Sequence, residues 1–231
     1  MKKVSVIIPA YNEAARITDT VSAVRMIPEV TEVIVIDDAS TDETGHLATA
    51  AGARVIRLPR NSGKGAALNK GVQAAAGDII VLLDADLGES AQEARNLILP
   101  VINGEVDMAV ARLPSPKTKG GFGLVRGLAS RGIRFFTGLE MKAPLSGQRA
   151  MSRETLSAVT PFADGYGVEV ALTIRAVRRG YRVAEIPLSM RHRETGRNVS
   201  GFLHRGRQFR DVLITLGRCY FEHRRTGKVA G

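Results

Sequence analysis

The sequence predicts an α/β fold with a mainly parallel central sheet flanked by helices. Short runs of branched apolar residues, which are typical of strands buried on both faces, alternate with helical patterns in the first half of the chain. Polar or acidic residues follow most of these runs. Strands that alternate with helices form right-handed βαβ units, and such units build a parallel sheet.

Predicted elements in the first half are separated by short polar turns. The predicted strands cover residues 4–9, 33–36, 54–58 and 79–83. The predicted helices between them cover residues 14–26, 42–51 and 65–76. Gly77 ends the third helix, because glycine readily adopts the conformation that stops a helix.

The second half of the chain is less regular. Its predicted elements are a strand over residues 107–111, a basic helix over 124–136, a short apolar element after 150, a helix ending near 179 and a strand over 181–187. Residues 114–123 are rich in proline, glycine and lysine, which predicts a loop.

The apolar run at 79–83 ends in Asp84-Ala85-Asp86. On an extended chain, side chains two residues apart share one face, so the two carboxylates repel each other. A divalent cation removes that cost, and an all-oxygen ligand set favours Mg²⁺ or Mn²⁺ over zinc. The alternative is that both acids lie in a solvated turn that ends the strand.

Acidic residues also follow the first and second predicted strands, namely Glu13, Asp37 and Asp38. Ligands of open parallel sheets bind at the carboxyl ends of the strands. The sequence therefore predicts that these three residues lie around one ligand site together with Asp84 and Asp86.

The composition suggests an anionic partner. The 231 residues carry a formal net charge of +10, which suits a phosphorylated substrate, an acidic membrane surface or nucleic acid. The one cysteine, Cys219, excludes an internal disulfide and fits a reducing compartment. No apolar run approaches the roughly 20 residues of a transmembrane helix, and the N-terminus does not resemble a signal peptide. We expect a cytoplasmic protein, and contact with the inner face of the membrane is left open.

Missing motifs exclude several nucleotide-binding classes. No Gly-x-Gly-x-x-Gly follows the first strand, so a dinucleotide oxidoreductase is not predicted. Lys64 precedes Gly65 and not serine or threonine, which excludes a P-loop NTPase. The segment 10–13 is not the Gly-rich, Arg-containing loop of nucleotidyltransferases. Paired aspartates without a metal repel a phosphate backbone, so we expect no nucleic-acid partner.

Four motifs, in this order, resemble those of family 2-type nucleotide-sugar glycosyltransferases with the GT-A fold. They are Val-Ile-Ile-Pro-Ala-Tyr-Asn-Glu at 6–13, Val-Ile-Asp-Asp-Ala-Ser-Thr-Asp at 35–42, Asn-Ser-Gly-Lys-Gly at 61–65 and Asp-Ala-Asp-Leu at 84–87. The resemblance implies a GT-A domain over residues 1–197. A basic amphipathic helical tail is expected over residues 198–231.

Two further stretches resemble different branches of this fold. Ser-Gly-Gln-Arg-Ala at 146–150 resembles Ser-Gly-Phe-Arg-Ala of polyprenyl-phosphate mannosyl- and glucosyltransferases, whereas residues 161–169 resemble glucosyl-3-phosphoglycerate synthases, which are retaining enzymes. The resemblance implies metal-dependent transfer of a hexose from a UDP-glucose or GDP-mannose type donor, with polyprenyl phosphate as the favoured acceptor. A soluble phosphorylated acceptor such as 3-phosphoglycerate and a non-catalytic nucleotide-sugar-binding module remain alternatives, and the stereochemical outcome stays open.

By this resemblance, Pro9, Tyr11, Glu13 and Asp38 line the nucleoside pocket, and Lys64 lies near the base or the diphosphate. The two carboxylates can accept hydrogen bonds from base and ribose. The alternative for Glu13 is an acid that favours a helix N-terminus, and for Lys64 a solvated loop lysine.

The resemblance also implies a metal site. Asp84 and Asp86 would hold Mg²⁺ or Mn²⁺, with Asp86 counted among the catalytic residues. His192 matches the late histidine of the phosphoglycerate-type enzymes, with a surface histidine as the alternative. The glutamine that polyprenyl-phosphate enzymes commonly carry two residues past the second aspartate is Gly88 here.

Negative charge grows on the leaving phosphate during transfer, and a guanidinium group can bind phosphate in a bidentate way. Arg149, Arg191 and Arg193 are the candidates, and solubility or salt bridging is their alternative. Glu169 is the expected base if the acceptor is a hydroxyl, whereas a phosphate acceptor needs none. Otherwise Glu169 is a polar residue at a helix start.

Apolar residues recur at near-helical spacing in the tail, with arginines among them. They are Phe202, Phe209, Leu213, Leu216 and Tyr220. A basic amphipathic helix can lie on an anionic membrane surface. The same apolar stripe could instead pack against the catalytic domain, and a homodimer is left open as well.

Overall fold

The computed structural model describes residues 2–114, 122–162, 167–190 and 199–226. Its centre is a seven-stranded sheet with the order β3-β2-β1-β4-β6-β5-β7. In chain order the strands are β1 (Val4–Ala10), β2 (Val30–Asp37), β3 (Arg54–Arg57), β4 (Ile79–Leu82), β5 (Met108–Arg112), β6 (Arg149–Ser152) and β7 (Val183–Pro187).

The sheet is mainly parallel and helices flank it, so both expectations are confirmed. Among the seven strands of the described residues, only β6 runs against its neighbours, β4 and β5, and the other pairings are parallel. The sequence predicted a short apolar element here and not its direction. The direction of a four-residue strand depends on the route of the preceding chain, which local periodicity does not encode.

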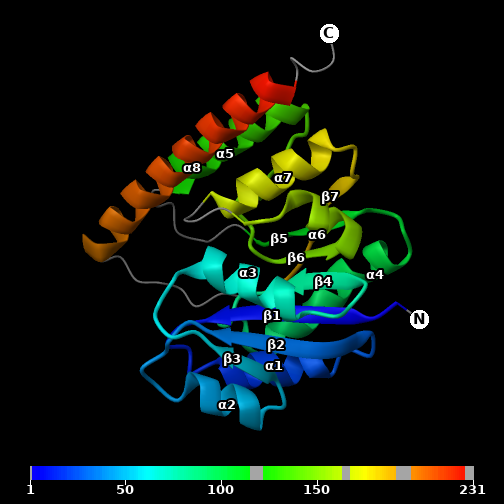
Figure 1. Ribbon diagram of the computed structural model, residues 1–231, viewed down its shortest axis with the longest axis vertical. Helices are drawn as coiled ribbons and strands as arrows, with labels where there is room; N and C mark the ends of the chain where they lie inside the picture. Colours follow the sequence, from blue (N-terminus) through cyan, green and yellow to red (C-terminus); the bar gives the residue numbers. More distant parts are fainter. Residues whose placement is uncertain (1, 115–121, 163–166, 191–198, 227–231) are drawn as a thin grey trace.

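Helices cover both faces of the sheet (Figure 1). They are α1 (Ile17–Arg25), α2 (Thr44–Ala50), α3 (Lys64–Ala74), the 3₁₀ helix η1 (Gly88–Ala94), α4 (Arg95–Ile102), α5 (Phe122–Thr137), α6 (Arg153–Val159), α7 (Val168–Arg178) and α8 (Val199–Thr226). Side chains of β1 alternate between two buried clusters: Val6 and Ile8 pack with α1, η1 and α4, and Ile7 packs with α3 and α7. The strand is buried on both faces, as its continuous apolar run predicted.

Strand direction brings distant loops to one edge of the sheet. The carboxyl ends of β1, β2 and β4 all lie at this edge, because these three strands are parallel neighbours. Antiparallel β6 starts there, since Arg149 pairs with Leu82. Residues 144–148 therefore meet the loop that carries Asp84 and Asp86.

Helix α8 packs beside α5 and α7 (Figure 1). Two glycines permit this: a Cβ at Gly132 would collide with Leu216, and a Cβ at Gly167 would collide with Thr215. The expected boundary between domain and tail, at residues 197 and 198, lies outside the described residues. Within the described ranges, no helix combines the length and apolar character that crossing a bilayer requires.

Candidate active site

Asp84 is held from two sides at the end of β4. Its Oδ1 lies 2.8 Å from the ammonium nitrogen of Lys64, the first residue of α3. Its Oδ2 accepts a hydrogen bond of 2.6 Å from the side-chain amide of Gln148. Charge-assisted hydrogen bonds of this kind are short and strong, so the orientation of the Asp84 carboxylate is fixed.

Gln148 is buried, with 1% of its surface exposed, and precedes β6 directly. The hydroxyl of Ser146 donates to its Oε1 at 3.1 Å, which leaves the amide nitrogen facing Asp84. Gln148 lies in the motif at 146–150, and the linear sequence assigns it no role. Its burial in the structure indicates the role, because buried polar side chains are normally hydrogen-bonded.

Lys64 links Asp84 to α7. Its Nζ lies 3.5 Å from Oε1 of Glu169, which stands in the first turn of α7. Burial lowers the pKa of Lys64, but the carboxylates of Asp84 and Glu169 outweigh it and hold the pKa above its ordinary value. A Cβ at Gly147 would lie 2.7 Å from Lys64 Nζ and 3.3 Å from Asp84 Oδ1, so glycine leaves room for this ion pair.

Asp86 is partly exposed on the loop between β4 and η1. The buried hydroxyl of Thr20 braces this loop on both sides of Asp86, because it donates to the carbonyl of Ala85 at 2.9 Å and accepts from the amide of Gly88 at 2.8 Å. The backbone that presents Asp86 is therefore attached to α1, the helix that follows the Glu13 loop.

The carboxylate of Asp38 binds main-chain amides of the protein itself, a role that the sequence did not predict. Its two oxygens accept the amides of Ser62 and Gly63, each at 2.8 Å, and only 4% of the residue is exposed. These bonds shape the loop that leads into α3 and so set the start of the helix at Lys64. Each carboxylate oxygen can accept more than one hydrogen bond, so a ligand donor can still be received.

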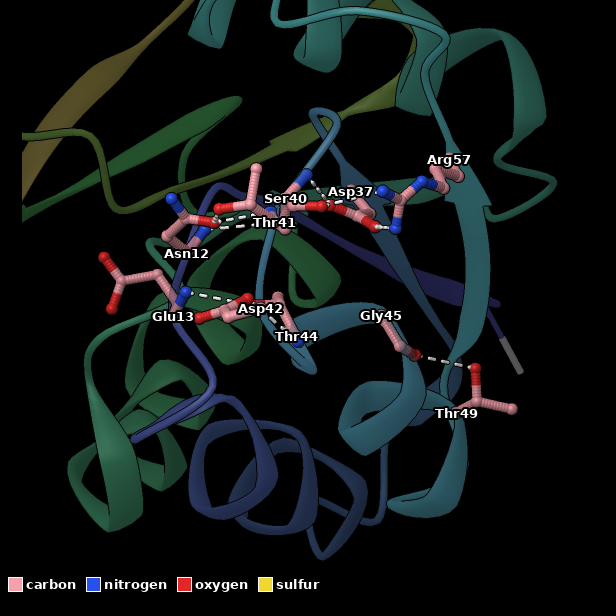
Figure 2. Close-up of polar contacts among 10 residues, drawn as sticks. All are labelled: Asn12, Glu13, Asp37, Ser40, Thr41, Asp42, Thr44, Gly45, Thr49 and Arg57. Carbon is pink, nitrogen blue, oxygen red and sulfur yellow. Dashed lines mark hydrogen bonds and ion pairs between the residues drawn. The ribbon is translucent and has the colours of Figure 1, made fainter.

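The loop after β1 is braced against the loop after β2 (Figure 2). Asn12 adopts a left-handed φ of 56°, and its Oδ1 accepts the amide of Thr41 at 2.8 Å. Asparagine tolerates this conformation better than most residues. The amide of Glu13 donates to Oγ1 of Thr44 at 2.8 Å, while its carboxylate points away from Thr44 and Asp42.

The sequence suggested that Asp37 lies around the ligand site, but the structure places its side chain in the interior. It is fully buried, its Oδ1 accepts the amide of Ser40 at 2.8 Å, and its Oδ2 lies 2.9 Å from Arg57 (Figure 2). The side chain of Asp37, the last residue of β2, lies between Arg57 of β3 and Gly45 of α2. The next residue, Asp38, accepts a hydrogen bond from the amide of Ser62. Of the other nucleoside-pocket candidates, Pro9 is partly buried and Tyr11 is 46% exposed.

Arg149 is also placed differently from the expected phosphate-binding residue. Its side chain has 0% exposure and hydrogen-bonds inward to Ser146 and Thr173. It therefore does not line the surface at which a diphosphate could bind. Arg191, His192 and Arg193 lie outside the described residues.

The acids at the end of β4 fit a divalent metal that arrives with phosphates. In the parts of the chain that the structure describes, no three histidine, cysteine, aspartate or glutamate side chains are grouped to hold a metal by themselves. Mg²⁺ is commonly bound through one or two carboxylates, with water and substrate phosphates completing its shell. Asp84 and Asp86 are suited to that role.

Solved structures share this fold. The structure of glucosyl-3-phosphoglycerate synthase from Mycobacterium tuberculosis in complex with Mn²⁺, UDP and phosphoglyceric acid aligns with a TM-score of 0.77 at 32% identity, over 94% of this chain and 78% of that one. By sequence, glucosyl-3-phosphoglycerate synthase of the same organism is 35% identical over 94% of this chain and 74% of its own length. Undecaprenyl-phosphate mannosyltransferase of Micrococcus luteus is 29% identical over 84% and 86%.

The fold and the edge of acids therefore define a glycosyltransferase of the GT-A class. Residues 5–156 match the family described as glycosyl transferase family 2, and the chain belongs to that family. The expected fold, family and enzyme class are confirmed. The roles of individual residues stay predictions.

Proposed function

We propose that this enzyme uses Mg²⁺ or Mn²⁺ to transfer a hexose from a nucleoside-diphosphate sugar, of the UDP-glucose or GDP-mannose type, to a phosphorylated acceptor. The observation that supports this most is the cluster at the sheet edge, where Lys64 contacts both Asp84 and Glu169 and Gln148 holds Asp84. The solved relatives support the cofactor and the donor, since they contain Mn²⁺ or Mg²⁺ with UDP.

In this reaction the bond between the anomeric carbon and the diphosphate oxygen breaks, and a bond to an acceptor oxygen forms. The metal, when bound, supplies Lewis-acid stabilisation of the charge on the leaving diphosphate. Asp84 and Asp86 would hold it. Lys64 would add a second positive charge nearby, because its ammonium remains protonated beside two carboxylates.

The favoured acceptor is a polyprenyl phosphate. A phosphate oxygen is already an anionic nucleophile, so no proton has to be removed. A lipid acceptor would also explain why α5 and α8 expose apolar side chains.

A soluble acceptor such as 3-phosphoglycerate is the second candidate, and the curated relatives support it. Its hydroxyl would have to lose a proton, which Glu169 could take if it lies within hydrogen-bond reach. Glu169 is only 13% exposed and its carboxylate faces Lys64. This places a carboxylate beside the cluster that would hold the donor.

The α5–α8 surface is the exposed apolar area formed by five side chains: Leu124 and Phe135 of α5, and Phe209, Leu213 and Phe221 of α8, each between 41% and 79% exposed. The opposite face of α8 packs inward through Val212, Thr215 and Cys219. The packed side of α8 agrees with the expectation that its apolar stripe lies against the catalytic domain. The exposed apolar side chains are left for a partner outside the domain.

The same two helices carry exposed arginines, namely Arg126, Arg131, Arg134, Arg210 and Arg218. Two of them form ion pairs, Arg134 with Glu140 and Arg210 with Asp211. Apolar side chains among cations complement an anionic lipid surface, where each basic residue contributes about 1 kcal/mol. We therefore propose that this surface contacts an anionic membrane and brings the site to its lipid acceptor. A homodimer that covers the same side chains is the competing outcome.

The decisive experiment offers labelled UDP-glucose or GDP-mannose with Mn²⁺, and either polyprenyl phosphate or 3-phosphoglycerate. Label in the organic phase supports the lipid acceptor, and label in a phosphatase-sensitive soluble product supports the alternative. A chelator should stop either reaction. Thermal stabilisation by a nucleoside diphosphate without any transfer would indicate a binding module and contradict the enzyme proposal.

A further inference from the structure

Arg149 is a fully buried arginine at the start of β6, beside the proposed site and outside its surface. We propose that Arg149 is a positioning residue: it joins the loop that supports Asp84 to the helical turn that carries Glu169, and thereby fixes the distance between these two carboxylates. The proposal rests on the proposed function for the roles of Asp84 and Glu169. It concerns a residue that does not touch the substrates.

The first connection runs from Arg149 to the Asp84 loop. Its Nε donates to the carbonyl of Ser146 at 2.9 Å. The hydroxyl of the same serine donates to Gln148, and the amide of Gln148 donates to Asp84 at 2.6 Å. The guanidinium therefore sets the backbone that aims Gln148 at Asp84.

The second connection runs from Arg149 to α7. Its Nη1 donates to Oγ1 of Thr173 at 2.9 Å, and that hydroxyl donates to the main-chain carbonyl of Glu169 at 3.0 Å. Thr173 is fully buried. The first turn of α7 is thus tied through one hydroxyl to the same guanidinium that holds Ser146.

This arginine lies in an unfavourable environment, which argues that it is not merely a core residue. Among the described residues its Nη2 finds no hydrogen-bond partner, and Nη1 also contacts the sulfur of Met108 at 3.7 Å. Burial lowers the pKa of Arg149 to about 10, while the carboxylates of Glu169 and Glu185 act in the opposite direction. Well-packed apolar residues often replace buried ionic groups without loss of stability.

Arginine suits this position because its planar fork presents donors in fixed directions. A lysine at Arg149 has a single nitrogen and cannot reach Ser146 and Thr173 with the same geometry. The spacing matters because Lys64 spans Asp84 and Glu169, at 2.8 and 3.5 Å. A misplacement of about 1 Å in a reacting group can cost about 100-fold in rate.

The cleanest test is at Thr173, since its replacement leaves the arginine in place. Thr173→Val keeps the shape and removes the hydroxyl, and Thr173→Ser keeps the hydroxyl. We expect Thr173→Val to lower kcat about tenfold or more, with the affinity for UDP and Mn²⁺ by calorimetry within about threefold of the parent. Thr173→Ser should behave like the parent. Equal kinetics for the two variants would overturn the proposal.

Arg149 itself is tested by Arg149→Lys and Arg149→Met. The matched control is Arg153→Met, because Arg153 also donates to main-chain carbonyls, of Gly77 at 2.7 Å and Ala75 at 2.9 Å, without a link to the site. We expect variants at both positions to lower the free energy of unfolding, but only the Arg149 variants to lower kcat. If Arg153→Met lowers kcat as much as Arg149→Met, the role is structural and the proposal fails.

Coupling between the two residues provides a second check. In the Arg149→Lys background, Thr173→Val should add little to the loss of kcat, because the connection is already broken. Additive losses would contradict the proposal. Amide hydrogen exchange over residues 169–173 should be faster in Arg149→Lys and Thr173→Val and unchanged in Thr173→Ser. This readout needs no turnover, so it separates failure of the positioning role from failure of the proposed function.

Discussion

The side-chain amide of Gln148 donates a 2.6 Å hydrogen bond to Oδ2 of Asp84, and it does so from a residue that is 1% exposed. The other oxygen of Asp84 faces Lys64. One carboxylate at the end of β4 is therefore oriented by an antiparallel neighbour strand and a helix N-terminus at once. Mutation of groups that orient a metal ligand typically lowers metal affinity about 10- to 100-fold.

Replacing Gln148 should weaken metal binding without unfolding the protein. We expect Gln148→Leu to reduce Mn²⁺-dependent UDP affinity about 10- to 100-fold, as is typical for residues that orient metal ligands. Calorimetric titration with UDP at fixed Mn²⁺ measures it. Gln73→Leu, at an exposed position of α3, is the control and should bind like the parent. Unchanged affinity in Gln148→Leu would mean that Asp84 is not held through this amide.

Asp86→Ala should abolish transfer and leave the fold intact. Asp86 stands at a strand tip with part of its surface exposed, so its removal creates no cavity in the core. Activity is measured with the acceptor that the parent uses, and thermal unfolding checks the fold. Transfer at the parental rate would remove Asp86 from the metal site.

Asp107 and Arg182 form an ion pair where β5 and β7 begin. This pair should make the free energy of unfolding depend on pH in the acidic range. Arg182 donates to both oxygens of Asp107, at 2.9 and 3.0 Å, and these bonds hold the pKa of Asp107 below its ordinary value. A lowered folded-state pKa stabilises the protein above the unfolded pKa of about 3.9, and the contribution disappears as the pH falls through the folded value.

Asp107→Asn should therefore lower the free energy of unfolding by about 1 kcal/mol at pH 7, because the pair is partly exposed. Near pH 2 the variant and the parent should be equally stable. Urea unfolding at both pH values measures the difference, with Asp19→Asn on the exposed side of α1 as the control. A difference that persists at pH 2 would point to packing and not to charge.

The α5–α8 surface should bind anionic vesicles. The parent is expected to sediment with vesicles that contain phosphatidylglycerol at low salt, and less so at high salt, because exposed charges are screened. Leu213→Glu should abolish sedimentation. Met26→Glu, at a residue 71% exposed near the end of α1, should not.

Light scattering of the same proteins distinguishes the competing occupant of this surface. If the parent is a dimer in solution, Leu213→Glu turns it into a monomer, and neither protein sediments with vesicles, then a second copy covers the surface. That result would contradict the membrane proposal and leave the glycosyltransferase proposal untouched.

The sequence by itself determined the α/β class, the strands that carry the sheet and the edge at which the acids gather. These features depend on local periodicity and on residues that end strands, such as Asp84 after the run at 79–83. The family also followed from linear motifs. Each of these is a short-range property, and neighbouring residues in the chain encode it fully.

Tertiary structure alone decided which polar side chains face the site and which face the core. Asp37 and Asp38 are adjacent in sequence, yet one binds Arg57 in the interior and the other organises the loop before α3. Arg149 lies inside because β6 is a central strand between β4 and β5, and the antiparallel direction of β6 brings Gln148 to Asp84. These placements depend on contacts between residues 20 positions apart, as for Asp37 and Arg57, to 64 positions apart, as for Asp84 and Gln148, which no local pattern records.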